Sequence, residues 1–233
     1  VWLIQITMTN FDEELQQLKD KLLLMASHAD SAVARSIRAL VERDDSLARH
    51  VQEDDTILDN YEIEIDDIAV HLLSMAPVAS TLRLITVAMK ISQNLERVGD
   101  EAVKIARHAV TLNGEPQLKP YVDLPRMAEM SLTMLRGALD AFVQRQPSAA
   151  RAIIPEDKAV DNLNGQLHRE LASFMVESPS NISRCLSLMV ISRSLERVAD
   201  HATNIAEEVV YLYEACDIRH SQQHKHEAQD SGS

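Results

Sequence analysis

An internal duplication constrains this chain more than any other feature of its sequence. Displacing the chain by 100 residues aligns residues 92–106 with residues 192–206, and nine of those fifteen positions are identical. Earlier in each half the displacement is 102, which pairs Asp55 with Asp157. A repeat of this length with its motifs in the same order predicts two copies of one supersecondary unit packed together.

The repeated unit is predicted to be helical. Apolar residues recur at three- and four-residue spacing almost throughout, and the chain holds five Gly, three Phe, four Tyr and one Trp. Neither a GxGxxG nor a GxxxxGK[ST] loop occurs, which excludes those two designs for binding nucleotides. The sequence therefore predicts an all-α fold of two tandem antiparallel three-helix bundles related by the duplication.

Prolines, glycines and capping residues place the boundaries of the predicted units. Asn10 is the expected N-cap of the first helix. The helices are expected at about 10–43, 45–76, 80–112, 124–145, 148–177 (kinked at Pro155) and 180–216. The predicted organisation is an N-terminal extension at 1–9, a first bundle at 10–113, a linker at 114–123, a second bundle at 124–217 and a disordered polar tail at 218–233.

The charge of the chain limits its partners. Asp and Glu number 36 against 23 Lys and Arg, which gives a net charge of -13 with His neutral. Binding to nucleic acid depends on neutralising phosphates, so we expect no nucleic-acid partner. The two cysteines form no CxxC pair and no apolar run is long enough to span a membrane, so a reducing cytoplasm fits best.

Acidic residues spaced four apart recur in both halves and form the candidate site. This spacing puts two carboxylates on one helix face, where like charges cost a few tenths of a kcal/mol that a bound cation can offset. The candidate metal ligands are Asp55, Asp59, Glu62, Asp66, Glu96 and Asp100 in the first half, and Asp157, Asp161, Glu196, Asp200 and His201 in the second. Such oxygen donors suit Mg²⁺, Mn²⁺ or iron, with Zn²⁺ where His joins. A solvated acidic surface without metal is the competing interpretation.

Catalytic patterns are missing from the sequence. A carboxylate-bridged di-iron oxidase needs Glu-x-x-His pairs on two bundle helices, and no Glu precedes a His by three residues here. No GxSxG is present either, and neither cysteine stands in the context of a nucleophile. We therefore expect a protein that is not an enzyme.

The motifs themselves resemble those of a known family. Residues 95–100, Leu-Glu-Arg-Val-Gly-Asp, and residues 195–207, Leu-Glu-Arg-Val-Ala-Asp-His-Ala-Thr-Asn-Ile-Ala-Glu, lie in two tandem three-helix halves. Together with the opening Phe-Asp-Glu-Glu-Leu at 11–15 and the Pro-x-x-Ile-Ser-Arg run at 179–184, they resemble the PhoU family over about residues 8–217. Lys104 in place of Asn204, and the missing counterparts of Glu62 and Asp66, distinguish the two halves.

The resemblance implies a function that the residues alone do not. It implies a cytoplasmic, homodimeric regulator that contacts the ATPase of the phosphate ABC transporter and a sensor histidine kinase, and that represses phosphate uptake and the phosphate-starvation response. Membrane association would occur only through those partners. It also implies multinuclear clusters of iron or zinc, with Mg or Mn possible, on the carboxylate motifs. The alternatives are a carboxylate-rich bundle for metal storage or metal redox chemistry, and a helical adaptor without metal.

Overall fold

Helices are the only regular secondary structure within the residues that the structure, a computed structural model, describes. These residues are 2–75 and 78–218, with side chains described from residue 10 onward. The first half contains α1 (Trp2–Glu42), α2 (Asp45–Glu53), α3 (Asp55–Ser74) and α4 (Ala79–Asn113). The second half contains α5 (Asp123–Gln144), α6 (Pro147–Ile153), α7 (Asp157–Glu177) and α8 (Ile182–Glu214), with 3₁₀ turns at Ile154–Glu156 and Pro179–Asn181. The predicted all-α class is confirmed.

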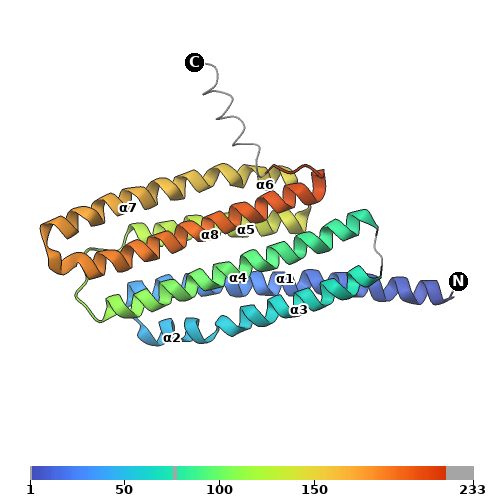
Figure 1. The fold of residues 1–233 in the computed structure, drawn as a ribbon, viewed down its shortest axis with the longest axis horizontal. Helices are drawn as coiled ribbons and strands as arrows, with labels where there is room; N and C mark the ends of the chain where they lie inside the picture. Colours follow the sequence, from blue (N-terminus) through green and yellow to red (C-terminus); the bar gives the residue numbers. More distant parts are fainter. Residues whose placement is uncertain (1, 76–77, 219–233) are drawn as a thin grey trace, which may run out of the picture.

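Each half is a bundle of three helical layers (Figure 1). The second layer consists of two successive helices, α2 and α3 in the first half and α6 and α7 in the second. In the second half the break lies at Pro155, as predicted, within the 3₁₀ turn Ile154–Glu156, because proline cannot continue the backbone hydrogen bonds of a helix. In the first half the prediction of one unbroken helix over 45–76 is wrong. The chain turns at Asp54, whose side chain accepts a 2.7 Å hydrogen bond from Arg35 on α1. Residues 76 and 77 lie outside the described residues.

The first helix begins earlier than the sequence indicated. It starts at Trp2, so the prediction that Asn10 caps its N-terminus is wrong. Asn10 instead lies within the helix and donates a 3.1 Å hydrogen bond to Glu14 one turn later. The segment before residue 10 contains neither Gly nor Pro, so nothing in it opposes helical backbone angles. The predicted disordered tail falls almost wholly in 219–233, outside the described residues.

The two bundles pack side by side along α4 and α8, which run antiparallel and make the most extensive contact between any two elements. Lys90 pairs with Glu208 at 3.0 Å, and Arg197 pairs with Glu101 at 3.3 Å. These contacts place the midpoint of the pair near Gly99, which aligns with Ala199 in the repeat. The molecule therefore has an approximate two-fold axis between α4 and α8.

The interiors of both bundles are filled by aliphatic side chains, as the spacing predicted. Leu22, Ile65 and Leu95 are fully buried in the first bundle, and Leu135 and Leu195 in the second. None of the helices that the structure describes combines the length and apolar character needed to cross a membrane.

Candidate functional site: two carboxylate stripes

The first carboxylate stripe runs across the contact between α3 and α4. Its members are Asp55, Asp59, Glu62 and Asp66 on α3 and Glu96 and Asp100 on α4. Burial raises the pKa of Asp55, and the charges of Asp59 and Asp100 raise it further. The pKa of Glu96 is raised in the same way, by burial and then by Asp100, against the opposing effect of Arg97. The fold thus brings carboxylates from two helices close enough to repel one another.

The second carboxylate stripe lies at the equivalent contact between α7 and α8. It consists of Asp157 and Asp161 on α7 and Glu196 and Asp200 on α8. Burial, followed by the charges of Asp161 and Asp200, raises the pKa of Asp157 to about 6. Glu196 is 7% exposed, and burial and Asp200 also raise its pKa. Glu196 is thus buried while Asp161 and Asp200 are exposed, so the second stripe runs from the surface into the contact between α7 and α8.

The two stripes differ in length. Asn164 and His168 occupy the α7 positions that correspond to Glu62 and Asp66. Both turn toward Ser192 on α8, whose hydroxyl donates to the Asn164 Oδ1 at 2.8 Å and lies 3.1 Å from the His168 Nε2. A hydrogen-bonded cluster of Asn164, His168 and Ser192 therefore replaces the last turn of the acidic stripe, and the second stripe holds four carboxylates where the first holds six.

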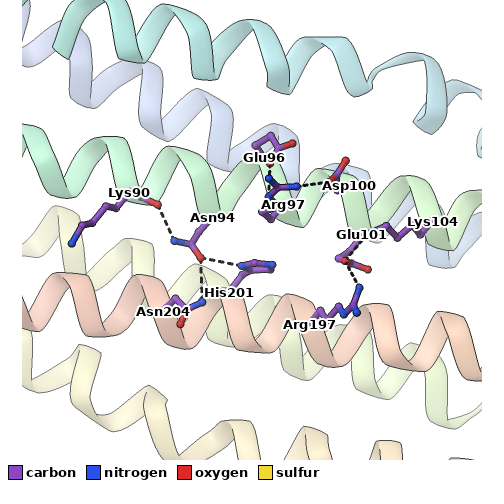
Figure 2. Close-up of polar contacts among 10 residues, drawn as sticks. All are labelled: Lys90, Asn94, Glu96, Arg97, Asp100, Glu101, Lys104, Arg197, His201 and Asn204. Carbon is purple, nitrogen blue, oxygen red and sulfur yellow. Dashed lines mark hydrogen bonds and ion pairs between the residues drawn. The ribbon is translucent and has the colours of Figure 1, made fainter. Parts of the chain in front are cut away.

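One guanidinium is paired with each stripe. Arg97 on α4 lies 3.3 Å from Glu96 and donates a 3.3 Å hydrogen bond to Asp100, as Figure 2 shows. Arg193 on α8 donates to Glu196 at 2.5 Å. These arginines balance part of the negative charge, and the sequence argument did not single them out for this role. The signal was present in the i,i+3 and neighbouring positions that they occupy relative to the glutamates.

His201 does not join the second stripe, and its placement there is wrong. Consecutive helix residues differ by about 100° around the axis, so the neighbour of Asp200 faces away from the α7 contact. The His201 ring instead lies 2.9 Å from Asn94 on α4 (Figure 2). Burial lowers its pKa; nearby Arg97 and Arg197 add to this shift and Glu101 opposes it.

A groove of about 610 Å³ opens at this contact between α4 and α8, and is called the central groove below. Glu101, Lys104, Arg197 and His201 are among the side chains that line it. Glu101 is 4% exposed and accepts hydrogen bonds from Lys104 at 2.8 Å and from Arg197 at 3.3 Å. Burial acts to raise its pKa, but these hydrogen bonds outweigh burial and hold the pKa below its ordinary value.

The carboxylate oxygens of the two stripes are the kind of ligand that a hard cation prefers. Three of their buried oxygens, the Asp66 Oδ1, Asp157 Oδ1 and Glu196 Oε2, have no hydrogen-bond partner. An unpaired buried carboxylate oxygen is costly, and a bound cation would satisfy it, as would a hydrogen-bond donor. Within the part of the chain that the structure describes, no three His, Cys, Asp or Glu side chains already converge as a metal site. The carboxylates would have to turn inward to close around an ion.

Two pseudo-symmetric helical bundles, each with an acidic stripe at the contact between its second and third layers, define a class of internally duplicated helical proteins. A PhoU domain matches the chain twice, over residues 22–109 and 124–209. The chain belongs to the PhoU family. The two matched segments coincide with the two bundles, so the duplication read from the sequence is confirmed.

Similar proteins share almost the whole length of the chain. It is 40% identical over 212 residues to a phosphate-specific transport system accessory protein PhoU homolog of Pseudomonas putida, covering 90% of this chain and 83% of that protein. A protein of the same description from Rhizobium meliloti is 39% identical, with 88% and 87% covered.

Two crystal structures show the same fold. PhoU from Pseudomonas aeruginosa superposes with a TM-score of 0.85 at 38% identity, covering 88% of this chain and 100% of that one. The phosphate transport system regulatory protein PhoU from Streptococcus pneumoniae gives 0.83 at 28% identity, with 89% and 99% covered.

Proposed function

We propose that this protein is a metal-binding regulatory adaptor of phosphate uptake. The observation that carries the proposal is the retention of a carboxylate stripe in both halves of a chain whose relatives are named accessory proteins of the phosphate-specific transport system. In this proposal it works in the cytoplasm as a homodimer. It contacts the ATPase of the phosphate ABC transporter and a sensor histidine kinase, and it lowers uptake and the starvation response when phosphate is plentiful.

Cations at the two stripes support this role by fixing helix pairs. Asp55 and Asp157 begin α3 and α7, while Glu96 and Glu196 lie in the middle of α4 and α8. A cation bound between these carboxylates would clamp the second layer of each bundle to the third. Iron or zinc clusters, or Mg²⁺ or Mn²⁺, would supply the positive charge. The residues of the chain supply the oxygen donors and the rigid helices that present them.

The regulatory part of the proposal is tested by genetic complementation. A bacterial host that lacks its own PhoU-family gene but retains a phosphate-starvation reporter receives this chain. We expect the reporter to fall to its repressed level in high phosphate. Full reporter activity with a folded, expressed chain would refute the regulatory role. A pull-down with the host transporter ATPase then separates failure to bind from failure to signal.

The metal part is tested on the purified, tagless protein. Elemental analysis of wild-type protein is compared with a variant that carries Glu96→Gln, Asp100→Asn, Glu196→Gln and Asp200→Asn. We expect metal in the wild type to be lost in the variant while helicity is kept. A variant that retains all its metal would show that the ions bind elsewhere, for instance at histidines.

A further inference from the structure

Each carboxylate stripe is paired with one arginine, which binds carboxylate groups that a metal ion would also need. The Arg97 Nε lies 3.3 Å from the Glu96 Oε2, and its Nη1 lies 3.3 Å from the Asp100 Oδ2. In the second half, the Arg193 Nη1 lies 2.5 Å from the Glu196 Oε1. The other oxygen of Glu196, Oε2, has no hydrogen-bond partner. A guanidinium and a metal ion on one carboxylate share its charge and repel each other, so the two compete.

The two arginines occupy positions that the duplication does not relate. The counterpart of Arg193 in the first half is Gln93, and the counterpart of Arg97 in the second half is Arg197. Arg197 turns away from its own stripe and pairs with Glu101 across the central groove.

The side chains in the central groove explain why different arginines pair with the two stripes. The residue that corresponds to Glu101 in the second half is His201, which has no carboxylate to offer Arg97. Arg97 therefore pairs along its own helix, with Glu96 (Figure 2). In the second half Arg197 pairs with Glu101 instead of its own stripe, and Arg193 pairs with Glu196. Because Arg97 and Arg193 occupy different positions in the repeat, descent from one ancestral repeat does not explain why an arginine binds the glutamate in both halves.

We propose that Arg97 and Arg193 are built-in counter-ions that occupy the stripes without metal and are released when metal binds. This inference rests on the metal binding in the proposed function and names its regulation. A bound dication takes the glutamate oxygens and repels the guanidinium. Arg97 and Arg193 are 63% and 54% exposed, so their ion pairs are weak enough to break readily. Metal binding would then free a positive charge beside each stripe, and the charge of Arg97 lies at the contact between α4 and α8.

The released charge lies where a partner can detect it. Arg97 already lines the central groove beside Lys104 and Arg197. Without metal, each of these three cations is paired with a carboxylate. With metal, Arg97 would become available to a carboxylate of another protein. Metal binding at a stripe is thereby converted into a change of surface charge without any movement of the helices.

The experiment measures binding of Mn²⁺ by isothermal titration to the full chain. Arg97→Gln and Arg193→Gln each remove a competitor, so each should bind Mn²⁺ about two- to five-fold more tightly, the range expected for breaking an exposed ion pair. Arg197→Gln is the matched control, because its charge acts on Asp200 without occupying a stripe oxygen. Arg126→Gln, an exposed α5 residue, controls for net charge. Circular dichroism confirms that each variant is folded.

A second readout follows the arginines directly. Phenylglyoxal modification, mapped by mass spectrometry, should become faster at Arg97 and Arg193 when Mn²⁺ is added, and should stay unchanged at Arg126. This measurement separates release of the guanidinium from a purely electrostatic effect of removing charge.

The outcomes separate this inference from the function on which it rests. Unchanged or weaker Mn²⁺ binding in both variants overturns it, because arginines that orient the ligands should weaken binding when removed. Equal tightening by Arg197→Gln, with no change in arginine reactivity, also overturns it, since charge alone would then account for the effect. No Mn²⁺ binding by the wild type refutes the metal part of the proposed function as well.

Discussion

Replacing Asp157 by Asn should stabilise the metal-free protein at neutral pH. Asp157 lies beside Asp161 and Asp200, and its Oδ1 is buried without a hydrogen-bond partner. Its pKa rises from the ordinary 3.8 to about 6, first through burial and then through those two charges. The charged form is therefore less stable in the folded chain than in the unfolded chain, and an amide of nearly the same shape removes that cost.

The magnitude follows from the shift. About 2 pH units correspond to about 3 kcal/mol if none of the charge is screened. Asp157 keeps part of its contact with water, and as the first residue of α7 it gains from the helix dipole, so we halve the value to about 1.5 kcal/mol. For a chain of this size, this free energy raises Tm by about 3–6 °C.

The gain must also depend on pH. Below pH 6 the folded chain takes up a proton at Asp157 while the unfolded chain stays charged down to about 3.8, so the wild type recovers stability as the pH falls. The difference between Asp157→Asn and wild type should be largest above pH 7 and should shrink toward zero near pH 4.

Thermal unfolding followed by circular dichroism, in chelator, at pH 7.5 and pH 4.5 measures both effects. The exposed Asp140 on α5 provides the control variant Asp140→Asn, which should change Tm little at either pH. A Tm for Asp157→Asn that is unchanged or lower at pH 7.5 would refute the reasoning. A gain of the same size at both pH values would show that the charge is not its cause.

Two further substitutions test the packing and the groove. Gly99→Ala should destabilise the protein by about 1–3 kcal/mol, because the new Cβ would lie 2.3 Å from the Leu58 Cδ1, whereas Gly165→Ala meets nothing closer than 3.6 Å and should stabilise its helix; urea denaturation of both variants gives the comparison. Glu101→Gln should cost about 1–2 kcal/mol at pH 7, because it removes the charge that Arg197 binds. Since the pKa of Glu101 is lowered, its contribution is present above pH 4.5 and is lost as the pH falls through the folded-state pKa, so the cost should fade in acid; equal cost at pH 7 and pH 3 would contradict this.

The fold was predictable because several levels of the sequence agreed. The repeat, the apolar spacing and the position of Pro155 all predicted paired helical bundles, and the structure contains them. The break at Asp54 was not predictable, because no Gly or Pro marks it. It depends on Arg35, which lies 19 residues away in sequence and reaches Asp54 only once α1 packs against it.

The sequence predicted which carboxylates share a face of one helix, but it did not predict which helix faces pack against each other. Spacing of four residues correctly placed Glu96 with Asp100, and the repeat placed Glu196 with Asp200. Whether α3 faces α4 with its acidic side could not be read from spacing. In the structure, Asp55 on α3 lies close enough to Asp100 on α4 for the two charges to repel each other. His201 was misplaced because adjacency in sequence was taken for adjacency on a helix face, although one residue turns the helix by about 100°.

The two halves share four equivalent carboxylates at the stripes, but they differ at the end of each stripe and at the central groove. A duplicated site that serves one purpose twice needs the same donors twice, which the carboxylate pairs satisfy. A surface that meets a single partner has no need of two-fold symmetry. At the α4–α8 contact Glu101 stands opposite Arg197, whereas Arg97 stands opposite His201, so the groove presents different charges on its two sides. In the proposed function, the stripes would therefore take the cations, and the unequal groove between them would take a partner that binds in one orientation.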